Sequence, residues 1–524
     1  MTVSSPSPSI PGPLPKAERA LAWSVWIFHS LFAFVIAYWV SNGKAKGWIK
    51  HWMQDSCYVS GAKMDLSDAE WAYYRQTVWH LLLDYSAHSL GIFISKRFLP
   101  CSTISNYAFI AIGFLLQIHM SSFQCIFVLY SFSVLVIVAT WLTGGSKWTP
   151  WLLCIVFIVR ATQIVPFSSG THIFYREFNI YLYGSIKILN LALFLCDLKP
   201  GKSDFSKIMA DSLIYFSYLP YSMTLIVRFE DFIQQFETWQ KTTEICWNSV
   251  KCALWFGFRL VFWFGFIELI LHFIHVQALF NSPDSLVNSL NSYEVSAIAY
   301  VAGQLFHVKY VVIFGVPAFF AALDGFRPPP PPICISRVSL YSRMWRFFDN
   351  GLYQFLKYQV YIPAMRKPLP LFWSILRSLG ALCAVFGVVL AWHGTRRHFI
   401  FWVTLSATEL IVERIGWQIW KIPKVQRIRK RLGEHCCRRI MATLMLLTVT
   451  PGIFGVFFFL GQEGVGETIS QNVVVQGVLD VFSINISIFP LTAGFAFLHI
   501  LTLGYFFNNV CLDLEFYQKH KKMV

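Results

Sequence analysis

One histidine stands at the end of a long apolar run, between a tryptophan and a glycine. The run extends from Phe372 to Trp392 with Arg377 as its only charged residue, and His393 and Gly394 follow it directly. An imidazole has an unperturbed pKa of about 6.5, so it accepts and returns a proton near neutral pH. Gly394 leaves room for backbone or a reacting molecule to approach closely. His393 is therefore a candidate general base. Taken alone, a histidine at a span end more often only packs there, so the residues leave both interpretations open.

A second group of polar residues lies upstream of this run. Arg346 and Asp349 are three residues apart, a spacing that makes them neighbours on a helix surface. Apolar residues around them recur at three- and four-residue spacing, which predicts one continuous helix with an apolar stripe. These residues are Trp345, Phe348, Leu352 and Phe355. We expect Asp349 either to form an interfacial ion pair with Arg346 that orients the helix, or to hold a carboxylate at the edge of a membrane-embedded site.

A cysteine follows a stiff proline segment ahead of this helix. Pro328 to Pro332 are consecutive prolines, which favour an extended conformation and cannot continue a helix, and Cys334 comes directly afterwards. The twelve cysteines of the chain form no Cys-x-x-Cys pair, so the sequence indicates neither a disulfide framework nor a structural metal site. Cys196, Cys436 and Cys437 stand beside apolar runs near basic residues, where reversible S-palmitoylation is a candidate modification.

The elements that position these residues are predicted to be membrane helices. The chain has 524 residues, of which 56% are hydrophobic and 13% are charged, about half the charged share of an ordinary soluble domain. No Asp, Glu, Lys or Arg occurs from Phe98 to Ser146, a run that is long enough for two spans of roughly 20 residues with a turn near residues 120–122. Backbone polar groups in lipid must be satisfied within the element, so spans of this length are helices.

Further apolar segments extend this pattern along the chain. The segment 21–40 has too long an apolar core for a signal peptide and no small-residue cleavage site after it, which predicts a retained anchor. The other candidates are 79–95, 150–167, 173–196, 211–227, 253–275, 295–323, 371–392, 440–462 and 483–512. We predict an all-α polytopic membrane protein with about ten to twelve transmembrane or re-entrant helices.

The net charge of +16 follows from the membrane topology and does not indicate a nucleic-acid partner. The basic residues gather in short stretches between spans, above all from Lys421 to Arg439, as is typical of cytosolic loops that face anionic lipid. The Ser/Pro-rich residues 1–20 predict a disordered cytosolic tail ahead of a membrane domain over 21–512. Within a basic cytosolic tail over 513–524, Lys521 to Val524 match a dilysine retrieval signal, which predicts the endoplasmic-reticulum membrane, with the Golgi as the alternative.

Three sequence elements together resemble the membrane-bound O-acyltransferases. They are the Arg-x-Phe-Asp-x-Gly-Leu segment within Trp345–Leu352, the Tyr-Ile-Pro element at 361–363, and the Trp-His-Gly element at 392–394. The resemblance covers roughly residues 323–466, a catalytic core, and within the superfamily it is strongest to the Hedgehog acyltransferases, which are protein-cysteine N-palmitoyltransferases. It implies a helical bundle that encloses an intramembrane catalytic chamber.

The same resemblance implies roles for individual residues. His393 corresponds to the catalytic histidine and Asp349 to a second catalytic residue, with Arg346, Trp345, Trp392 and Gly394 in support. Cys334 corresponds to a haem-ligating cysteine of the family, which implies haem b as a cofactor, and thiolate ligation of haem iron is chemically sound. The implied reaction transfers palmitate from palmitoyl-CoA to the N-terminal cysteine of a secreted Hedgehog-like protein, among membrane lipids.

The sequence also departs from the family pattern. Residues 395–398 are more basic than the family predicts, and the expected downstream Asn is replaced near Ala407 and Thr408. These differences leave the acceptor open, so a serine hydroxyl of a secreted protein, a lipid or a glycerol is the alternative. A non-catalytic relative that regulates such an enzyme is another, against which the retained His393 argues. A transporter would show internal repeats, and we find none.

Overall fold

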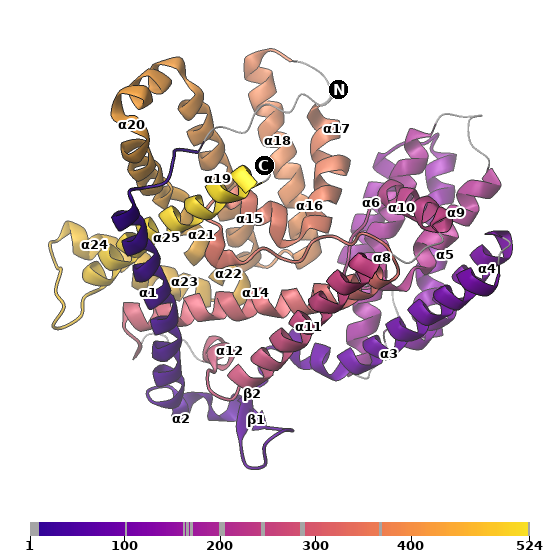
Figure 1. The fold of residues 1–524 in the computed structure, drawn as a ribbon, viewed down its shortest axis with the longest axis horizontal. Helices are drawn as coiled ribbons and strands as arrows, with labels where there is room; N and C mark the ends of the chain where they lie inside the picture. Colours follow the sequence, from indigo (N-terminus) through magenta and orange to yellow (C-terminus); the bar gives the residue numbers. More distant parts are fainter. Residues whose placement is uncertain are drawn as a thin grey trace.

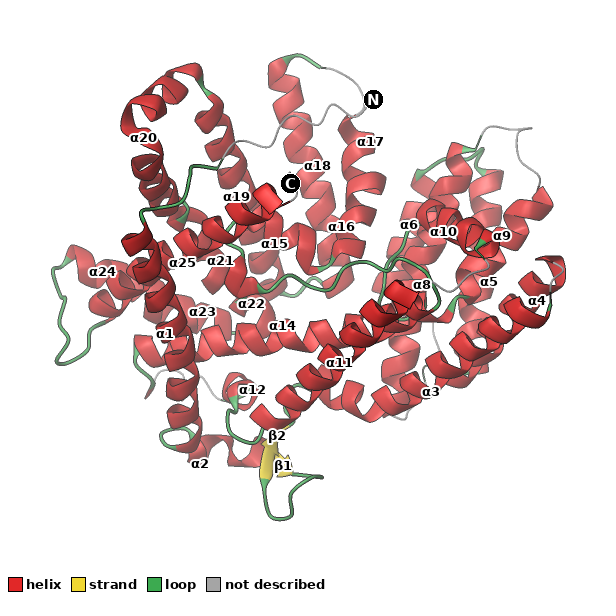
Figure 2. Ribbon diagram, viewed as in Figure 1, coloured by secondary structure: helices red, strands yellow, loops and turns green. Residues whose placement is uncertain are grey.

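The protein is described by a computed structural model that covers residues 10–99, 102–160, 163, 167, 171–198, 205–242, 247–282, 289–365 and 369–521. Over these residues helices joined by loops make up the fold, and the strands described are those of one antiparallel hairpin, in which β1 (Met53–Asp55) pairs with β2 (Lys63–Asp65) (Figure 2). The predicted all-α class is therefore confirmed, with this small hairpin as an addition.

Nine segments of the described chain are long and apolar enough to cross a membrane. They lie in α1 (Lys16–Asn42), α4 (Ser102–Met120), α5 (Phe123–Leu142), α8 (Thr171–Asp197), α11 (Trp247–Ile270), α14 (Ser292–Leu323), α18 (Leu371–His393), the α20–α22 region (Pro423–Leu460) and α25 (Ala493–Lys521). The multi-pass character is confirmed, and so is the turn predicted near residues 120–122, since α4 ends at Met120 and α5 begins at Phe123.

The chain also contains shorter or more polar helices, of which α20, α21 and α22 together make up the span over Pro423–Leu460. They are α2 (Lys46–Ile49), α3 (Ala69–Phe98), α6 (Trp148–Val159), α9 (Phe205–Ser217), α10 (Phe229–Lys241), α12 (Val276–Phe280), α15 (Tyr341–Phe348), α16 (Asn350–Leu356), α17 (Ile362–Met365), α19 (Arg397–Lys421), α20 (Pro423–Leu444), α21 (Leu446–Gly455), α22 (Phe457–Leu460), α23 (Val465–Ile469) and α24 (Gln476–Phe482). Single turns of 3-10 helix occur at Lys50–Trp52, Leu219–Tyr221 and Ile335–Arg337, and π-helical turns at Lys357–Tyr361 and Ser470–Val475.

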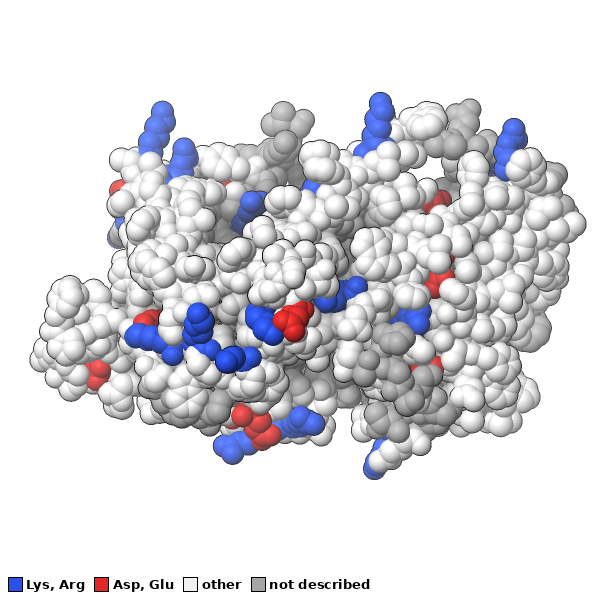
Figure 3. Space-filling view, turned by 90° about the horizontal axis from the view of Figure 1, so that it is seen from below, with Lys and Arg blue, Asp and Glu red and all other residues white. Residues whose placement is uncertain are grey.

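The long helix α14 lies across the centre of the molecule (Figure 1). In the most apolar window of α14 and of α8, 78% of the residues are buried, against 22% in α1, α4, α11 and α18. Helices α1, α3, α11 and α25 pack around α14. The outer helices expose large side chains such as Leu31, Phe262 and Leu447, and most of the face in Figure 3 is uncharged. Such a surface suits lipid tails.

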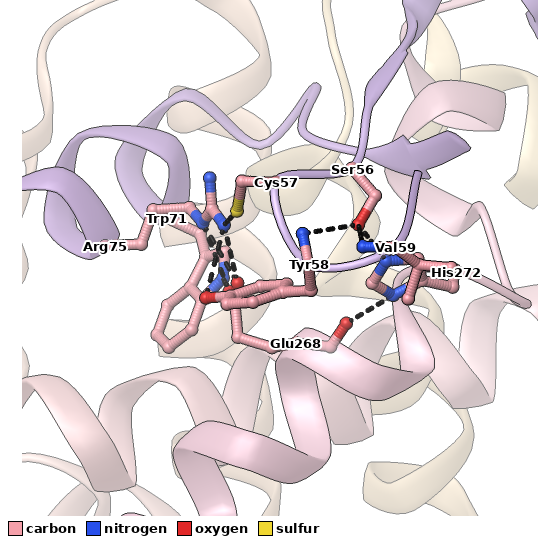
Figure 4. A network of polar contacts seen from close by, with 8 residues as sticks. All are labelled: Ser56, Cys57, Tyr58, Val59, Trp71, Arg75, Glu268 and His272. Carbon is pink, nitrogen blue, oxygen red and sulfur yellow. Dashed lines mark hydrogen bonds and ion pairs between the residues drawn. The ribbon is translucent and has the colours of Figure 1, made fainter. Parts of the chain in front are cut away.

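A buried carboxylate of α11 anchors the first turns of α3. Glu268, near the end of α11, accepts hydrogen bonds from Trp71 Nε1 at 2.8 Å and from Arg75 Nη2 at 2.7 Å. Close by, His272 Nε2 lies 2.8 Å from Ser56 Oγ in the hairpin loop. Figure 4 shows these side chains converging from the hairpin, α3 and α11. The network fixes the start of α3 against α11.

The predicted span over residues 211–227 is wrong. Helix α9 ends at Ser217, and a 3-10 turn and irregular chain follow as far as α10. Pro220 supplies no N–H for a helix. The Ser217 carbonyl packs closely on Gly113 of α4, where an added Cβ would lie 2.0 Å from its oxygen. The segment is apolar because it is buried in the protein, with Tyr218 and Leu219 each 0% exposed.

The other predicted spans differ in extent from the helices. Helix α6 stops at Val159, and α3 is interrupted by charged residues, so neither is among the nine candidates. The apolar run over 440–462 is divided between the end of α20, α21 and α22, and the run over 483–512 becomes helical only from Ala493. Apolar composition alone does not separate lipid-facing helix from buried loop, which is why these boundaries differ.

Both predicted tails are ordered where they are described. Residues 10–15 pack on α20, where Arg438 Nη1 donates to the Pro11 carbonyl at 3.0 Å, and α1 begins at Lys16. Arg438 also pairs with Asp513 at 2.7 Å, in α25, which continues to Lys521. Helix α1 therefore begins within the tail predicted over 1–20, and residues 513–521 belong to α25. Residues 1–9 and 522–524, with most of the dilysine motif, lie outside the described residues.

Candidate active site

The end of α18 places His393 in a cluster of aromatic rings. Its ring centroid lies 5.2 Å from that of Trp402 in α19 and 5.0 Å from that of Phe459 in α22, at interplanar angles of 84° and 83°. Such edge-to-face contacts are favourable and orient the imidazole. No hydrogen bond within the described part of the chain engages the ring nitrogens of His393, so they are free for a reacting molecule.

Gly394 sets the backbone at this histidine. Its φ of 103° and ψ of 166° lie in a region that only glycine adopts readily, and its N–H donates to the Leu390 carbonyl at 2.8 Å. Helix α18 therefore ends directly after His393, and the chain turns into α19. The predicted importance of Gly394 thus has a backbone basis.

Trp392 contacts a residue that the sequence did not single out. Its ring lies 5.2 Å from that of Tyr183 in α8, at 84°. The carboxylates of Asp349 and Glu70 both interact electrostatically with the Tyr183 hydroxyl. Tyr183 thus contacts the end of α18 through Trp392 and lies within electrostatic range of Asp349. The available sequence signal was a hydroxyl within an apolar span.

Asp349 lies at a break between two helices, so the predicted continuous helix over this segment is wrong. Helix α15 ends at Phe348, and the Asp349 side chain accepts from the Leu352 N–H at 2.9 Å as the N-cap of α16. Arg346 is exposed, with its guanidinium over the Tyr353 ring at 5.5 Å. No Arg346–Asp349 ion pair forms in the described part of the chain, because the cap turns the backbone between them.

A continuous set of ring contacts joins the Asp349 junction to His393. Phe348 stacks on Phe306 of α14 at 5.6 Å, Phe306 contacts Phe459 at 5.8 Å, and Phe459 contacts His393. A second connection runs through Trp345, whose ring lies 5.7 Å from that of Trp402. The structure therefore places Trp345, Phe348 and His393 in one aromatic cluster. Asp349 adjoins the cluster as the residue after Phe348, 44 residues before His393 in sequence (393 − 349).

The Asp349 carboxyl lies outside the nine candidate spans. Burial raises the pKa of Asp349 to about 6. The backbone N–H groups of Leu352 and Gly351 stabilise the carboxylate and offset part of this increase. At neutral pH this carboxyl is mainly ionised but is a better proton acceptor than an ordinary aspartate. A carboxylate that accepts protons readily is suited to assist a histidine that acts as a base.

A buried lysine ties a distant segment to the same region. Lys309 Nζ lies 2.8 Å from Asp68 and 2.9 Å from Glu70, at the start of α3, and Lys309 is 7% exposed. The Tyr310 hydroxyl donates to Glu70 at 2.9 Å, and its ring lies 5.9 Å from that of Phe348. Lys309 is a charged residue within an apolar run, and its partners lie about 240 residues away in the sequence.

Comparison with known sequences identifies the architecture. Residues 99–432, more than half of the chain, match the sequence model of the MBOAT, membrane-bound O-acyltransferase family. The chain belongs to this family. The matched region includes both Asp349 and His393 of the aromatic cluster, and the family resemblance predicted from residues 345–394 is confirmed.

Three curated relatives of this membrane-bound O-acyltransferase match part of its length. The protein-cysteine N-palmitoyltransferase HHAT of Mus musculus is 32% identical over 211 residues, 40% of this chain and 41% of the relative. The protein-cysteine N-palmitoyltransferase Rasp of Drosophila melanogaster is 32% identical over 180 residues, 34% of this chain and 35% of the relative. The protein-cysteine N-palmitoyltransferase HHAT-like protein of Mus musculus is 26% identical over 176 residues, 34% of each chain. The matches thus span 34–41% of the relatives' lengths.

Cys334 is the residue that would hold the haem iron implied by the resemblance. It is a free, half-buried thiol directly before the 3-10 turn Ile335–Arg337. Its neighbour Ser336 bonds to Tyr300 at 3.0 Å and to Gln304 at 2.9 Å, which fixes the turn against α14. The Ile333 N–H donates to the Phe347 carbonyl of α15 at 2.9 Å. A fixed free thiol fits the ligand chemistry of thiolate-bound haem.

Proposed function

We propose that this membrane-bound O-acyltransferase transfers a palmitoyl group from palmitoyl-CoA to the N-terminal cysteine of a secreted Hedgehog-like protein. The observation that supports the proposal most is His393, which ends a membrane span, has free ring nitrogens and packs between the rings of Trp402 and Phe459. The similarity to two proteins named protein-cysteine N-palmitoyltransferases supports the choice of acceptor.

The proposed reaction is aminolysis of a thioester. The α-amino nitrogen of the acceptor attacks the thioester carbonyl, the new C–N bond forms as the C–S bond breaks, and the products are an amide and the free thiol of CoA. His393 takes the proton that the amine loses and returns it to the departing thiolate. An α-amino group has a pKa near 8, so modest base assistance suffices, typically worth about 10² to 10⁴ in rate.

The neighbours of His393 support this base. Trp402 and Phe459 orient the ring through edge-to-face contacts, and the proposed role of Asp349 is to orient the base or the acceptor amine. Arg346 lies at the exposed end of α15, where it attracts the phosphates of CoA. Trp345, Trp392 and Gly394 position these groups through the contacts described above.

The proposal also includes the membrane in which the protein acts and its cofactor. A fatty thioester from the cytosol and a secreted acceptor meet only at a site inside a membrane, for which the dilysine motif supports the endoplasmic reticulum. Haem at Cys334 is part of the proposal on the strength of the resemblance and the free thiol. Its test is the absorption spectrum of the purified protein, with a Soret band in wild type that Cys334→Ala removes.

The deciding experiment follows palmitoyl transfer in detergent from palmitoyl-CoA to a peptide with an N-terminal cysteine. Wild type should transfer the acyl group, and His393→Ala should lose at least about a hundredfold in rate. His80, an exposed histidine of α3, provides the matched control, and His80→Ala should retain the wild-type rate.

Different outcomes separate the alternatives. Acetylating the peptide N-terminus should abolish transfer; transfer that persists would move the acceptor to a hydroxyl or thiol. Acyl-CoA binding without transfer to this peptide would point to another acceptor, such as a serine or a lipid. Absence of acyl-CoA binding would favour a non-catalytic relative.

A further inference from the structure

Two histidines from opposite ends of the chain face each other far from His393 in sequence. His29 of α1 and His499 of α25 place their Nε2 atoms 3.3 Å apart. The Tyr293 hydroxyl, from the first turn of α14, lies 3.5 Å from the same nitrogen of His499. All three side chains are partly buried where α1, α14 and α25 pack together. Neither histidine contacts the aromatic cluster around His393.

The surroundings of His29 fix its ring in one tautomer. Its Nδ1 lies 2.8 Å from the Val25 carbonyl oxygen. A carbonyl can only accept, so Nδ1 carries the hydrogen and Nε2 presents a lone pair toward His499. Histidines that bind metal ions usually donate their other ring N–H to a backbone carbonyl in this way, which raises the basicity of the ligating nitrogen.

The spacing of the pair matches a shared metal ion. Zinc binds imidazole nitrogen at about 2.0–2.1 Å in a tetrahedral arrangement, which sets two such nitrogens about 3.3 Å apart. The observed separation is 3.3 Å. We propose that His29, His499 and Tyr293 form a binding site for a divalent first-row metal ion, with Zn²⁺ as an ion that imidazole donors and this spacing suit.

A route for the ion lies beside the site. Tyr293 also lines a cavity of about 420 Å³ between the end of α1 and the start of α14. At its rim Lys44 pairs with Glu294 at 2.6 Å. Water in this cavity would reach the site from the Tyr293 side and complete a four-coordinate arrangement.

A hydrogen bond between the two rings is the competing explanation for their approach. In that case His499 donates its Nε2 hydrogen to His29 and the pair only joins α1 to α25. The two explanations differ in metal content, in spectrum and in the effect of removing the Tyr293 hydroxyl.

The test uses the full-length protein in detergent, equilibrated with Zn²⁺ and freed of unbound ion, with bound zinc measured by mass spectrometry. We expect wild type to hold one equivalent more than His29→Gln or His499→Phe. Tyr293→Phe should bind zinc about tenfold more weakly. The matched control is His51→Gln, at an exposed histidine, which should bind like wild type. Size-exclusion profiles identify any variant that fails to fold. If His499→Phe fails, the zinc content of His29→Gln and Tyr293→Phe is compared with that of wild type.

Cobalt distinguishes this site from the cysteines. Co²⁺ in the wild-type site should give the visible bands of tetrahedral nitrogen and oxygen coordination without thiolate charge transfer, and His499→Phe should remove them. Equal zinc in wild type and in the histidine variants, thiolate-type bands alone, or no bound zinc in wild type would each overturn the proposal.

Discussion

Gly394→Ala is the most informative single change at the end of α18. An added Cβ would meet only Phe399 ring carbons at 3.8 and 3.9 Å, which is ordinary contact, so the substitution creates no steric clash. Its whole effect comes from the backbone, since φ 103° and ψ 166° are disfavoured for any residue with a Cβ. Such strain costs on the order of 1–3 kcal/mol.

That strain can be relieved by distorting the last turn of α18, which carries His393. A cost of 1–3 kcal/mol corresponds to about a 5- to 150-fold shift from the intact to the distorted turn, at 1.36 kcal/mol for each factor of ten. We therefore expect Gly394→Ala to reduce palmitoyl transfer within that range. Its unfolding temperature, followed by tryptophan fluorescence in detergent, should also fall.

The same helix offers a matched glycine. A Cβ added to Gly387 meets no atom within 4 Å, and this glycine lies inside α18. Gly387→Ala should therefore be neutral or slightly stabilising, because alanine is the better helix former. If Gly394→Ala is as active and as stable as Gly387→Ala, the backbone at Gly394 does not position His393, and the reasoning is refuted.

Three further predictions concern charged residues. Arg438→Met should cost about 3–5 kcal/mol of stability, because it leaves Asp513 buried without its partner. Arg439→Met removes an exposed pair with Glu18 and should leave thermal unfolding unchanged. Equal shifts in the unfolding temperature of the two variants would contradict this. Because the pKa of Asp349 is raised to about 6, its carboxylate form is lost as the pH falls through that value. Below pH 6 the wild-type transfer rate should therefore fall about one power of ten per pH unit more steeply than that of Asp349→Asn, and parallel pH profiles would exclude Asp349 from the reaction. Lys309→Met leaves Asp68 and Glu70 without their shared cation and should lower the unfolding temperature. Adding Glu70→Gln should restore part of the loss. A double variant that is no more stable than Lys309→Met would argue against the stabilising role of these ion pairs.

The sequence predicted the parts of the site that lie close together along the chain. Trp392, His393 and Gly394 end an apolar span as expected, because span length and a terminal glycine are local properties. Asp349 remains a predicted site residue, but the partner expected for it, Arg346, does not pair with it. The spacing rule that joined it to Arg346 assumes one helix, whereas the aspartate side chain caps a new one.

The remaining neighbours could not be predicted, because tertiary packing alone brings them together. Tyr183 reaches Trp392 from α8, and Glu70 reaches Tyr310 from the start of α3. Neither contact has a signature in spacing or composition. The segment after Ser217 shows the same limit for the fold, since an apolar run suits buried irregular chain as well as a membrane helix.

The packing of α1 against α25 has a consequence for biogenesis. These helices come from the two ends of the chain, and both contact α14. A ribosome that adds roughly 5–20 residues per second needs on the order of a minute to make the chain between them. During that interval α1 resides in the bilayer with one flank uncovered and His29 without its counterpart. The bundle therefore closes only after translation of the last span, and α1 is the segment on which a membrane chaperone would act in the meantime.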